Sequence, residues 1–337
     1  MTKSAVLLND TSYANHHGCR TVIDNLTHLM GCINVKIIGC SPVGHEWRDD
    51  QSILNKIKKA DLIIINGEGT LHSGREEAER LLQAAVLFPE KRVILLNALY
   101  ENNPPEWKKY LEKFDIIGLR DPISYETCSA LVGKAKCHLT SDLSLYSASD
   151  FVEAPDKRQG IAIGDSVKKN IHRDLYSLYL KNKSENVYYL PIKSLNKYPL
   201  GVDLGFAKSI SQVRYRLKQT LKMYLDRNVV YYNSHNDFYE GLHGYEGYIT
   251  GRFHGVCLSI KSMTPFVAVS SNTGKIERLL KSVGLEGRVL NKVDQTAFKK
   301  IKPYTDEEKN KIRTFIRESN DQWRRFITDA FQLERPL

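Results

Sequence analysis

An arginine and a histidine two residues apart, Arg252 and His254, stand between Gly251 and Gly255 after a strand-like apolar run. The junction of a parallel strand with the next helix presents free N–H groups and the positive end of a helix dipole, which favour an anion. A guanidinium can grip a phosphate or carboxylate, and an imidazole can move a proton near neutral pH. The pair therefore indicates an anion site with acid–base chemistry. The alternative is that Arg252 pairs with a structural acid and His254 is a core histidine.

A second candidate is the glycine-rich segment Asn66–His72, which directly follows the apolar run Leu62–Ile65. Its glycines permit backbone angles and close approaches that other residues forbid, so the turn can present N–H groups to a ligand. Glu68 and His72 are its candidate functional side chains. The alternative is a tight turn with a solvated Glu68. The segment lacks the Gly-Lys-Ser/Thr ending of a nucleoside triphosphate loop.

A third candidate lies between the first predicted strand and the first predicted helix, where Asn15, His16 and His17 follow one another. These side chains suit hydrogen bonds to sugar hydroxyls or assistance in proton transfer, and a capping or turn role is the alternative. Cys19 is a weak candidate for a covalent nucleophile, because no base supports it beyond the neighbouring histidines.

Further polar residues come directly after strand-like runs. Arg120 ends the run Ile116–Leu119, and the following Asp121 and Ser124 are expected to cap a helix. His235 follows the run Val229–Tyr232 and is a possible contact to a substrate, with a structural role equally open. Asn272 and Lys275 lie where a strand hands over to a helix, a position that suits anion binding.

Short β-rich runs alternate with helical periods, a pattern typical of α/β proteins with parallel sheets. A chain of 337 residues suits two domains. We predict two doubly wound domains facing a cleft, over residues 1–150 and 156–300, and a helix at 305–335 that packs across them. Ligands of such folds bind outside the carboxyl ends of the strands. The strands are predicted at Ala5–Leu8, Val35–Ile38, Leu62–Ile65, Val93–Leu96, Ile116–Leu119, His138–Leu139, Ile161–Ile163, Val187–Leu190, Val229–Tyr232, Tyr248–Thr250 and Phe266–Val269.

Composition narrows the class of protein. The hydrophobic content of 42% and the charged content of 26% are globular values. The net charge of +10 suggests an anionic partner, yet no nucleic-acid motif is present and we expect no nucleic-acid partner. The six cysteines contain no Cys-x-x-Cys pair, so neither a disulfide framework nor a metal site is expected. No run approaches the roughly 20 apolar residues of a membrane helix, so we expect a cytoplasmic protein.

The order of these motifs resembles that of the polysaccharide pyruvyl transferase family. Gly251–His254, Met263–Val267 and Ser271–Lys275 are similar to the C-terminal signature of that family. The glycine-rich turn and the elements around Arg120 and Asp142 fit in the same order. Two positions depart from the pattern, because Cys19 stands where an acid is usual and Glu68 replaces a middle glycine. These departures leave the fold unaffected but put donor and acceptor identity in question.

The resemblance implies a two-domain fold of the GT-B glycosyltransferase type and a transferase activity. The expected reaction moves a pyruvyl group from phosphoenolpyruvate to a sugar of a cell-surface polysaccharide or its lipid-linked precursor, without cofactor or metal. The alternative is a glycosyltransferase that uses a nucleotide-activated sugar, such as a CMP-linked ulosonic acid, in the synthesis of surface glycan. The first domain is the expected acceptor side and the second the donor side. Peripheral contact with the inner face of the membrane is a further expectation.

Motif position assigns the hypothetical roles of the side chains. The proton-transfer candidates are His254, His72 and His16. The donor-binding candidates are Arg252, Arg120, Asn272 and Lys275. The acceptor-binding candidates are Asn15, His17, Glu68 and His235.

Overall fold

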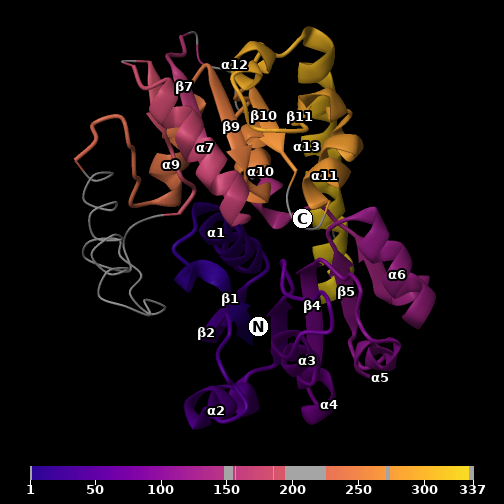
Figure 1. Ribbon diagram of the computed structural model, residues 1–337. Coiled ribbons are helices and arrows are strands. Elements are labelled where there is room, and N and C mark those ends of the chain that lie inside the picture. Colours follow the sequence, from indigo (N-terminus) through magenta and orange to yellow (C-terminus); the bar gives the residue numbers. More distant parts are fainter. Residues whose placement is uncertain are drawn as a thin grey trace. The chain divides into compact units, whose positions relative to one another are not determined.

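The computed structural model describes residues 2–147, 155, 157–184, 186–193, 225–270 and 274–333. The chain forms two compact units (Figure 1). Unit 1 comprises Met1–Ala14, Cys19–Asp150 and Ile316–Leu337, and unit 2 comprises Asn15–Gly18 and Phe151–Phe315. Asn272 lies outside the described residues, so its predicted role is not addressed by the structure.

Unit 1 is built on a parallel sheet of six strands in the order β2-β1-β3-β4-β5-β6. The strands span Lys3–Asp10 (β1), Val35–Pro42 (β2), Leu62–Asn66 (β3), Arg92–Ala98 (β4), Ile116–Leu119 (β5) and Cys137–Leu139 (β6). All six strands predicted in this half are present. Because β1 has β2 on one side and β3 on the other, the strand order reverses there, and the carboxyl ends of β1 and β3 flank the topological switch point.

Helices cover both faces of this sheet. They span His17–Cys32 (α1), Gln51–Lys59 (α2), Glu76–Leu82 (α3), Ala84–Leu87 (α4), Lys108–Leu111 (α5) and Pro122–Val132 (α6). Asp50 caps α2 by accepting from two backbone N–H groups, and Asp121 caps α6 by accepting from the Ser124 N–H. The predicted capping role of Asp121 is therefore confirmed, and Ser124 supplies the N–H group that Asp121 caps.

The alternation of a strand's side chains divides the core of unit 1 in two. Val6 and Leu8 of β1 belong to the apolar cluster that includes residues of α2, α3, α5 and α6. Ala5 and Leu7 point to the opposite face and join a cluster with α1. Because both faces are covered, the strands read as continuous apolar runs in the sequence.

The helix α13 (Asp306–Phe331) also contributes to that second cluster. Its residues from Ile316 onward belong to unit 1, and Trp323, Phe326 and Ile327 pack in the same cluster as Ala5 and Leu7. The Trp323 indole also donates to the Ser141 carbonyl oxygen at 3.2 Å. The last third of the helix is thus a core element of unit 1.

Unit 2 repeats the architecture with a parallel sheet of five strands in the order β11-β10-β9-β7-β8. The strands span Ile161–Ser166 (β7), Val187–Tyr189 (β8), Gly247–Gly251 (β9), Phe266–Val269 (β10) and Val289–Leu290 (β11). The helices are Lys169–Lys181 (α7), His235–His243 (α9), Phe253–Lys261 (α10), Lys275–Val283 (α11) and Thr296–Lys300 (α12). Here the order reverses at β7, so the carboxyl ends of β7 and β9 flank the switch point.

One prediction of local structure was wrong. The apolar run Val229–Tyr232 is not a strand, because only Val229 forms a bridge, to Tyr189. Tyrosine-rich β propensity cannot make a strand without a partner for its backbone groups. The short β11 was not predicted, since two residues leave no periodic pattern.

Candidate active site

In unit 1 the switch point carries three buried asparagines at the ends of neighbouring strands. Asn66 ends β3, while Asn9 and Asn97 are the next-to-last residues of β1 and β4, and each of the three is at most 3% exposed. The Asn9 amide donates to the Asn66 carbonyl oxygen at 2.6 Å, and the Asn97 amide donates to Asn66 Oδ1 at 3.4 Å. Asn9 and Asn97 have φ of 63° and 56°, a left-handed backbone that asparagine tolerates. This edge is fixed by hydrogen bonds within the protein.

The glycine-rich turn follows β3 and fits tightly against β4. A Cβ atom on Gly67 would lie 2.5 Å from the Ala98 Cβ, so only glycine fits there. Glu68 adopts the left-handed region with φ of 37° and is 6% exposed. Its carboxylate accepts from the Cys19 thiol at 3.0 Å and from the Asn66 amide at 3.3 Å. Glu68 is therefore held from two sides.

The environment of Cys19 disfavours a thiolate. Burial raises the pKa of this thiol well above its usual value, and the neighbouring carboxylates Glu68 and Asp142 raise it further, while Arg120 opposes the change. A neutral thiol is a hydrogen-bond donor and a poor nucleophile. Cys19 thus donates a hydrogen bond to Glu68 and orients its carboxylate.

Arg120 forms a buried ion pair with Asp142. Its Nη1 donates to Asp142 Oδ2 at 2.6 Å, and the two side chains are 3% and 1% exposed. Asp142 also accepts from the Ser144 N–H through its other oxygen. The Arg120 guanidinium lies beside the glycine-rich turn, because a Cβ on Gly69 would be 3.7 Å from Nη2. The Asp142 carboxylate therefore holds the Arg120 guanidinium at this edge of the sheet and balances its positive charge.

His72 lies at the end of the same turn and is half-buried. Its Nδ1 is 3.1 Å from the Ser73 hydroxyl, and its backbone forms a bridge with Glu101. Among the predicted residues, unit 1 therefore holds Glu68, His72 and Arg120.

In unit 2 the switch point carries a different arrangement, centred on Arg252. This residue follows β9, and its Nε and Nη2 donate to one oxygen of Asp165 at 2.8 and 2.5 Å. Asp165 lies in β7, is 3% exposed, and accepts from the Ile192 N–H at 3.1 Å through its other oxygen. The sequence reasoning missed Asp165. A polar residue at the end of the first strand of the second half is the signal that points to it.

His254 lies at the start of α10, where its ring meets that of His16. The two ring centroids are 5.2 Å apart in an edge-to-face arrangement. The backbone makes this contact possible, because a Cβ on Gly18 would lie 2.2 Å from the His254 Cβ. The structure thus brings together two of the three predicted proton-transfer residues, from sequence positions more than two hundred residues apart.

The surroundings of His16 are basic. Burial lowers its pKa well below the usual value, and His254, Arg252, Lys193 and His17 lower it further in that order. His16 is therefore neutral near pH 7 and can accept a proton or a hydrogen bond. Arg252 and Lys193 also lower the pKa of His172, after burial, while Asp165 opposes them. This edge of unit 2 therefore carries several basic groups close together.

The other predicted residues of unit 2 occupy varied positions. The His17 ring is fully buried and stacks on Phe238 with centroids 4.7 Å apart, so it packs in the core rather than facing a ligand. Asn15 is half-buried, and so is His235 at the first position of α9. Lys275 begins α11 after the left-handed Gly274, and its Nζ lies 5.5 Å from the centroid of the Phe253 ring. Lys275 therefore lies near the residue that precedes His254.

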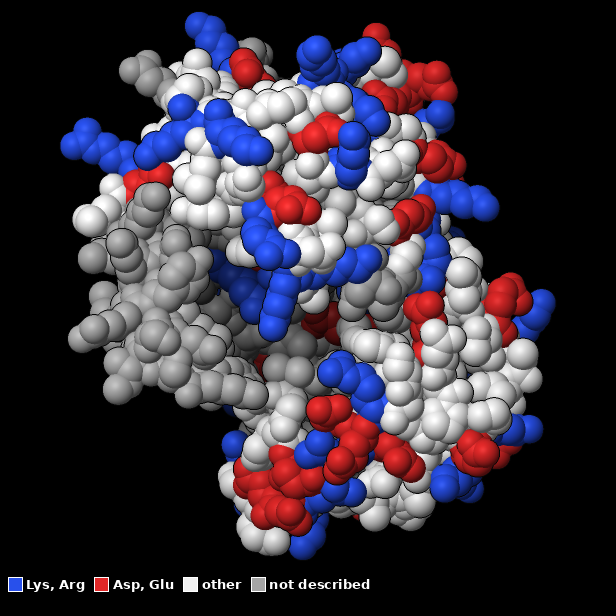
Figure 2. Space-filling view, viewed as in Figure 1, with Lys and Arg blue, Asp and Glu red and all other residues white. Residues whose placement is uncertain are grey.

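Basic residues also mark the surface of unit 2. Figure 2 shows Lys and Arg atoms gathered over α7, which carries the exposed Lys169, Arg173 and Lys181. In unit 1, acidic and basic side chains are interspersed around α3, among them Glu46, Arg48 and Arg80 (Figure 2). None of the helices within the described ranges is long and apolar enough to cross a membrane.

Comparison with solved structures defines the class of protein. A Listeria monocytogenes protein described as a UDP-N-acetylglucosamine 2-epimerase has a TM-score of 0.56 at 10% identity, over 99% of this chain and 97% of that one. The UDP-GlcNAc 2-epimerase of Neisseria meningitidis bound to UDP-GlcNAc has a TM-score of 0.55 at 12% identity, over 98% and 100%. HepE of Anabaena in complex with UDP and glucose has a TM-score of 0.50 at 11% identity, over 98% of each chain. The chain has the two-domain, Rossmann-like α/β fold of the GT-B type.

The family follows from the sequence itself. The model of the polysaccharide pyruvyl transferase family matches residues 28–273, which is more than half of the chain. The protein belongs to the polysaccharide pyruvyl transferase family and is a transferase. A comparison with curated protein sequences gives no match.

Proposed function

We propose that this protein transfers a pyruvyl group from phosphoenolpyruvate to a sugar of a cell-surface polysaccharide or its precursor. The observation that carries the proposal is the basic switch-point site of unit 2, where Arg252, Lys193 and His254 surround His16. Phosphoenolpyruvate carries a phosphate and a carboxylate on adjacent parts of a small molecule. A site with several cations at a strand-to-helix junction suits such a donor.

The reaction requires proton transfers that the histidine pair can perform. A proton is added to the methylene carbon of the donor while a sugar hydroxyl forms a bond to the neighbouring carbon and loses its own proton. The oxygen of a second hydroxyl of the same sugar then bonds to that carbon and loses its proton to the departing phosphate. The phosphate takes the electrons of its bond to carbon, and the ketal is complete. Neutral His16 suits the accepting step, and His254 beside the anionic donor suits the donating step. His72 remains the candidate from unit 1.

Arg252 is the proposed grip for the donor, and Asp165 is its positioning residue. The Arg252 guanidinium donates two hydrogen bonds to one Asp165 oxygen, through Nε and Nη2. This orients the planar group at the end of β9. Arg252→Lys keeps the charge but loses the fork, so we expect at least a tenfold loss of turnover. Wild-type turnover in that variant would reduce Arg252 to a structural partner of Asp165.

A nucleotide-activated sugar is the second candidate donor. HepE of Anabaena was solved with UDP and glucose, and the Neisseria meningitidis epimerase with UDP-GlcNAc. Both share the fold of this chain at low identity. A nucleotide diphosphate is also anionic, so the basic edge of unit 2 suits either donor. The alternative includes the CMP-linked ulosonic acids, which share a keto-acid-derived centre with the pyruvyl group.

Thermal stabilisation distinguishes these donors. A ligand that binds only the native state stabilises by about 2.7 kcal/mol at one hundred times its dissociation constant. We expect phosphoenolpyruvate to raise the melting temperature, and Arg252→Lys to reduce that shift. Stabilisation by UDP or CMP with no effect of phosphoenolpyruvate would favour the glycosyltransferase alternative. Inorganic phosphate at equal concentration is the control for nonspecific anion binding.

Unit 1 is the proposed acceptor side and unit 2 the donor side. The edge of unit 1 presents hydrogen-bonding groups, among them the Glu68 carboxylate, that suit the hydroxyls of a sugar, and the edge of unit 2 is basic. The basic surface of α7 also supports reversible contact with an anionic membrane, where a lipid-linked acceptor would lie. Such contact weakens as salt screens it. Cosedimentation with anionic vesicles at low and high salt tests it, and binding that salt does not reverse would contradict it.

A further inference from the structure

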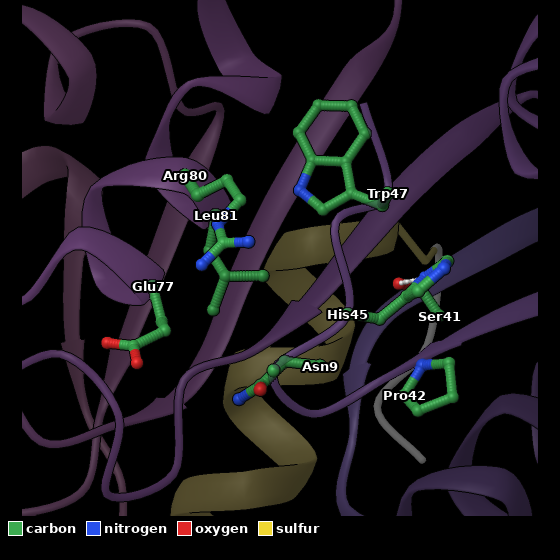
Figure 3. Close-up of a pocket in the computed structure, with 9 residues that line it drawn as sticks. Asn9, Ser41, Pro42, His45, Trp47, Glu77, Arg80 and Leu81 are labelled. Atoms are coloured by element: carbon green, nitrogen blue, oxygen red, sulfur yellow. Dashed lines mark hydrogen bonds between the residues drawn. The ribbon is translucent and has the colours of Figure 1, made fainter. Parts of the chain in front are cut away.

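A small hollow lies in unit 1 at the carboxyl ends of β1 and β2 (Figure 3). Asn9, Trp47 and Arg80 are among the residues that line it. It has room for about one water molecule and no more. A sugar or a phosphorylated donor does not fit in it, so the open edges at the ends of the strands remain the places for such ligands.

His172 lies on α7 at the basic edge of unit 2 and was not among the residues predicted from the sequence. The side chain is half-buried. The first turn of α7 packs against the end of β9, because a Cβ atom on Gly251 would lie 3.4 Å from the Cγ2 atom of Ile171. Ile171 immediately precedes His172, and Gly251 immediately precedes Arg252. The backbone therefore places His172 beside Arg252.

The turn that joins β7 to α7 is tied to the same strand end. The Ser166 hydroxyl donates to the Gly251 carbonyl oxygen at 3.3 Å, and it accepts from the Lys168 N–H at 3.3 Å. A Cβ atom on Gly251 would lie 2.6 Å from the Ser166 Cβ atom, so a glycine permits this close approach of β7 and β9. These contacts hold the start of α7, and with it His172, against the residue that precedes Arg252.

Charged groups from three other parts of unit 2 act on the His172 ring. Burial lowers the pKa of His172, Asp165 of β7 raises it, and Arg252 after β9 and Lys193 after β8 lower it again. On α7 itself the exposed Lys169 adds positive charge. Because the pKa lies below its usual value of about 6.5, the imidazole is largely neutral at pH 7 and has one N–H donor and one acceptor nitrogen.

The His172 ring is available to a ligand. Its nitrogens make no hydrogen bond to any residue within the described ranges. Asp165 is already engaged, because its oxygens accept from Arg252 and from the Ile192 N–H. Since the ring is only half-buried, a ligand can replace the water at its nitrogens. The neighbouring guanidinium and ammonium groups favour an anion as that ligand.

We propose that His172 contacts the phosphate group of the bound donor, where its ring N–H donates to a phosphate oxygen beside the Arg252 guanidinium. The inference rests on the proposed function, because that function supplies a donor with a phosphate. A phosphate has three acceptor oxygens and up to two negative charges, so it can meet Arg252, Lys193 and His172 together. A carboxylate has only two oxygens for these three groups.

This contact also assists the departure of phosphate. The phosphate takes the electrons of its bond to carbon as it leaves, so negative charge grows on it in the transition state. A hydrogen bond aimed at that charge is stronger in the transition state than in the bound donor. His172 would thus bind and stabilise the leaving group, whereas the proton transfers stay with His16 and His254.

The His172 ring signal in carbon-13 NMR spectra of the whole protein tests the contact. His172→Gln identifies the signal, and the probes are phosphoenolpyruvate, inorganic phosphate and pyruvate, which keeps the carboxylate but lacks the phosphate. We expect phosphoenolpyruvate and phosphate to shift the signal in a saturable way and to raise the pH at which it titrates, because a bound phosphate favours the imidazolium. His138 of unit 1 is the internal control, since it is also half-buried and burial also lowers its pKa.

Two outcomes of these spectra would overturn the proposal. One is a His172 signal that phosphoenolpyruvate leaves in place while it stabilises the protein. The other is a signal that pyruvate moves as far as phosphoenolpyruvate does, because the ring would then respond to the carboxylate or to charge alone.

Donor affinity in variants gives the second measurement. His172→Ala removes the hydrogen bond to a charged group and should weaken phosphoenolpyruvate by at least about tenfold. His172→Gln keeps an N–H donor, so it should bind more tightly than the alanine variant. His138→Ala is the matched control and should leave the affinity unchanged. Equal affinities of His172→Ala and the wild type would contradict the proposal.

The pH dependence of affinity separates a direct contact from a structural role. Between the lowered pKa of free His172 and its raised pKa in the complex, the complex binds a proton that the free protein lacks. Wild-type affinity should therefore gain as the pH falls through this range, and His172→Gln should gain less. Identical pH profiles of the two proteins would show that His172 does not touch the phosphate.

UDP separates this inference from the proposed function. If phosphoenolpyruvate neither stabilises the wild type nor moves the His172 signal while UDP does both, the donor assignment fails and the phosphate contact of His172 stands. If phosphoenolpyruvate stabilises the wild type and the His172 signal does not move, the inference fails alone. If neither anion moves the signal, the inference fails whichever donor is used.

Discussion

The two units present different chemistry at the same topological position. In unit 1 the end of β3 leads into a carboxylate held by a thiol and an amide, and the Arg120–Asp142 pair balances its own charge. In unit 2 the Arg252–Asp165 pair is accompanied by Lys193, and the groups that act on His16 are all basic. The same strand order therefore supports a polar edge with a carboxylate in one unit and a basic edge in the other. This difference supports the proposal that unit 2 binds the anionic donor.

The largest expected effect is a loss of stability on breaking the buried Arg120–Asp142 ion pair of unit 1. Arg120→Ala leaves Asp142 as an uncompensated buried carboxylate, so we expect a loss of about 3–5 kcal/mol in the free energy of unfolding. Urea denaturation measures it. Arg48→Ala is the control, since the Arg48–Glu46 pair is about one-third exposed and such pairs contribute at most about 1 kcal/mol. Equal losses in the two variants would remove the contrast between a buried structural pair and a surface pair.

The next effect concerns catalysis in unit 2. If His254 transfers a proton in the rate-limiting step, His254→Ala should lower turnover by about a hundredfold or more. His254→Gln should do nearly the same, because an amide keeps a hydrogen bond but cannot shuttle a proton. Steady-state kinetics with phosphoenolpyruvate and a saccharide acceptor measure both variants. A folded variant with near-normal turnover would make His254 a core histidine and pass the role to His16 or His72.

A smaller effect is the pH dependence that His16 gives to stability. Its pKa in the folded protein lies below the value of about 6.5 in the unfolded chain, so below that pH the unfolded chain binds a proton that the folded protein does not. Stability due to His16 is thus complete above about pH 6.5 and falls as the pH drops, by at most about 1.4 kcal/mol per unit.

The variant His16→Asn isolates this contribution, since burial also lowers the pKa of His138 and His172. Urea midpoints between pH 5 and 8 should fall less steeply in His16→Asn than in the wild type. Phosphoenolpyruvate should also reduce the wild-type slope, because a bound anion favours the imidazolium. Parallel slopes for the two proteins would show that the basic surroundings of His16 do not act on it.

The smallest expected effect is that of Cys19→Ser. A hydroxyl can still donate to Glu68, and the raised pKa of the thiol excludes a thiolate nucleophile near neutral pH. We expect turnover within about threefold of the wild type and slow alkylation of this cysteine. Loss of all activity in the serine variant, with trapping of a covalent intermediate on the wild-type thiol, would contradict this reading.

Sequence patterns predicted the sheets better than they predicted the contacts at their edges. Continuous apolar runs predict parallel strands because both faces of each sheet are buried, and the first sheet was predicted strand by strand. The strand expected at Val229–Tyr232 was wrong, because strand formation depends on a backbone partner that lies elsewhere in the chain. Local propensity contains no information about that partner.

Sequence patterns identified individual residues of the candidate site, but they did not predict which of those residues contact one another. Arg252 and His254 stood out because a cation and an imidazole follow a strand. That Arg252 pairs with Asp165, and that His254 meets His16, depends on the strand order of unit 2 and on the missing side chain of Gly18. His17 was also predicted as a site residue because it follows His16, but its ring is fully buried and stacks on Phe238. Adjacent histidines point in different directions, which sequence alone does not reveal.

The position of α13 has a consequence for how the protein is made. Unit 1 begins at the first residues of the chain, but its core is completed by Trp323, Phe326 and Ile327 near the other end. During translation most of unit 2 is synthesised in between, which takes about 8–33 s at about 5–20 residues per second. Throughout that interval the sheet face formed by Ala5 and Leu7 can pack against α1 but lacks α13. On the ribosome, the first unit to emerge is therefore the last that can finish folding, and its nascent form offers an apolar face to chaperones.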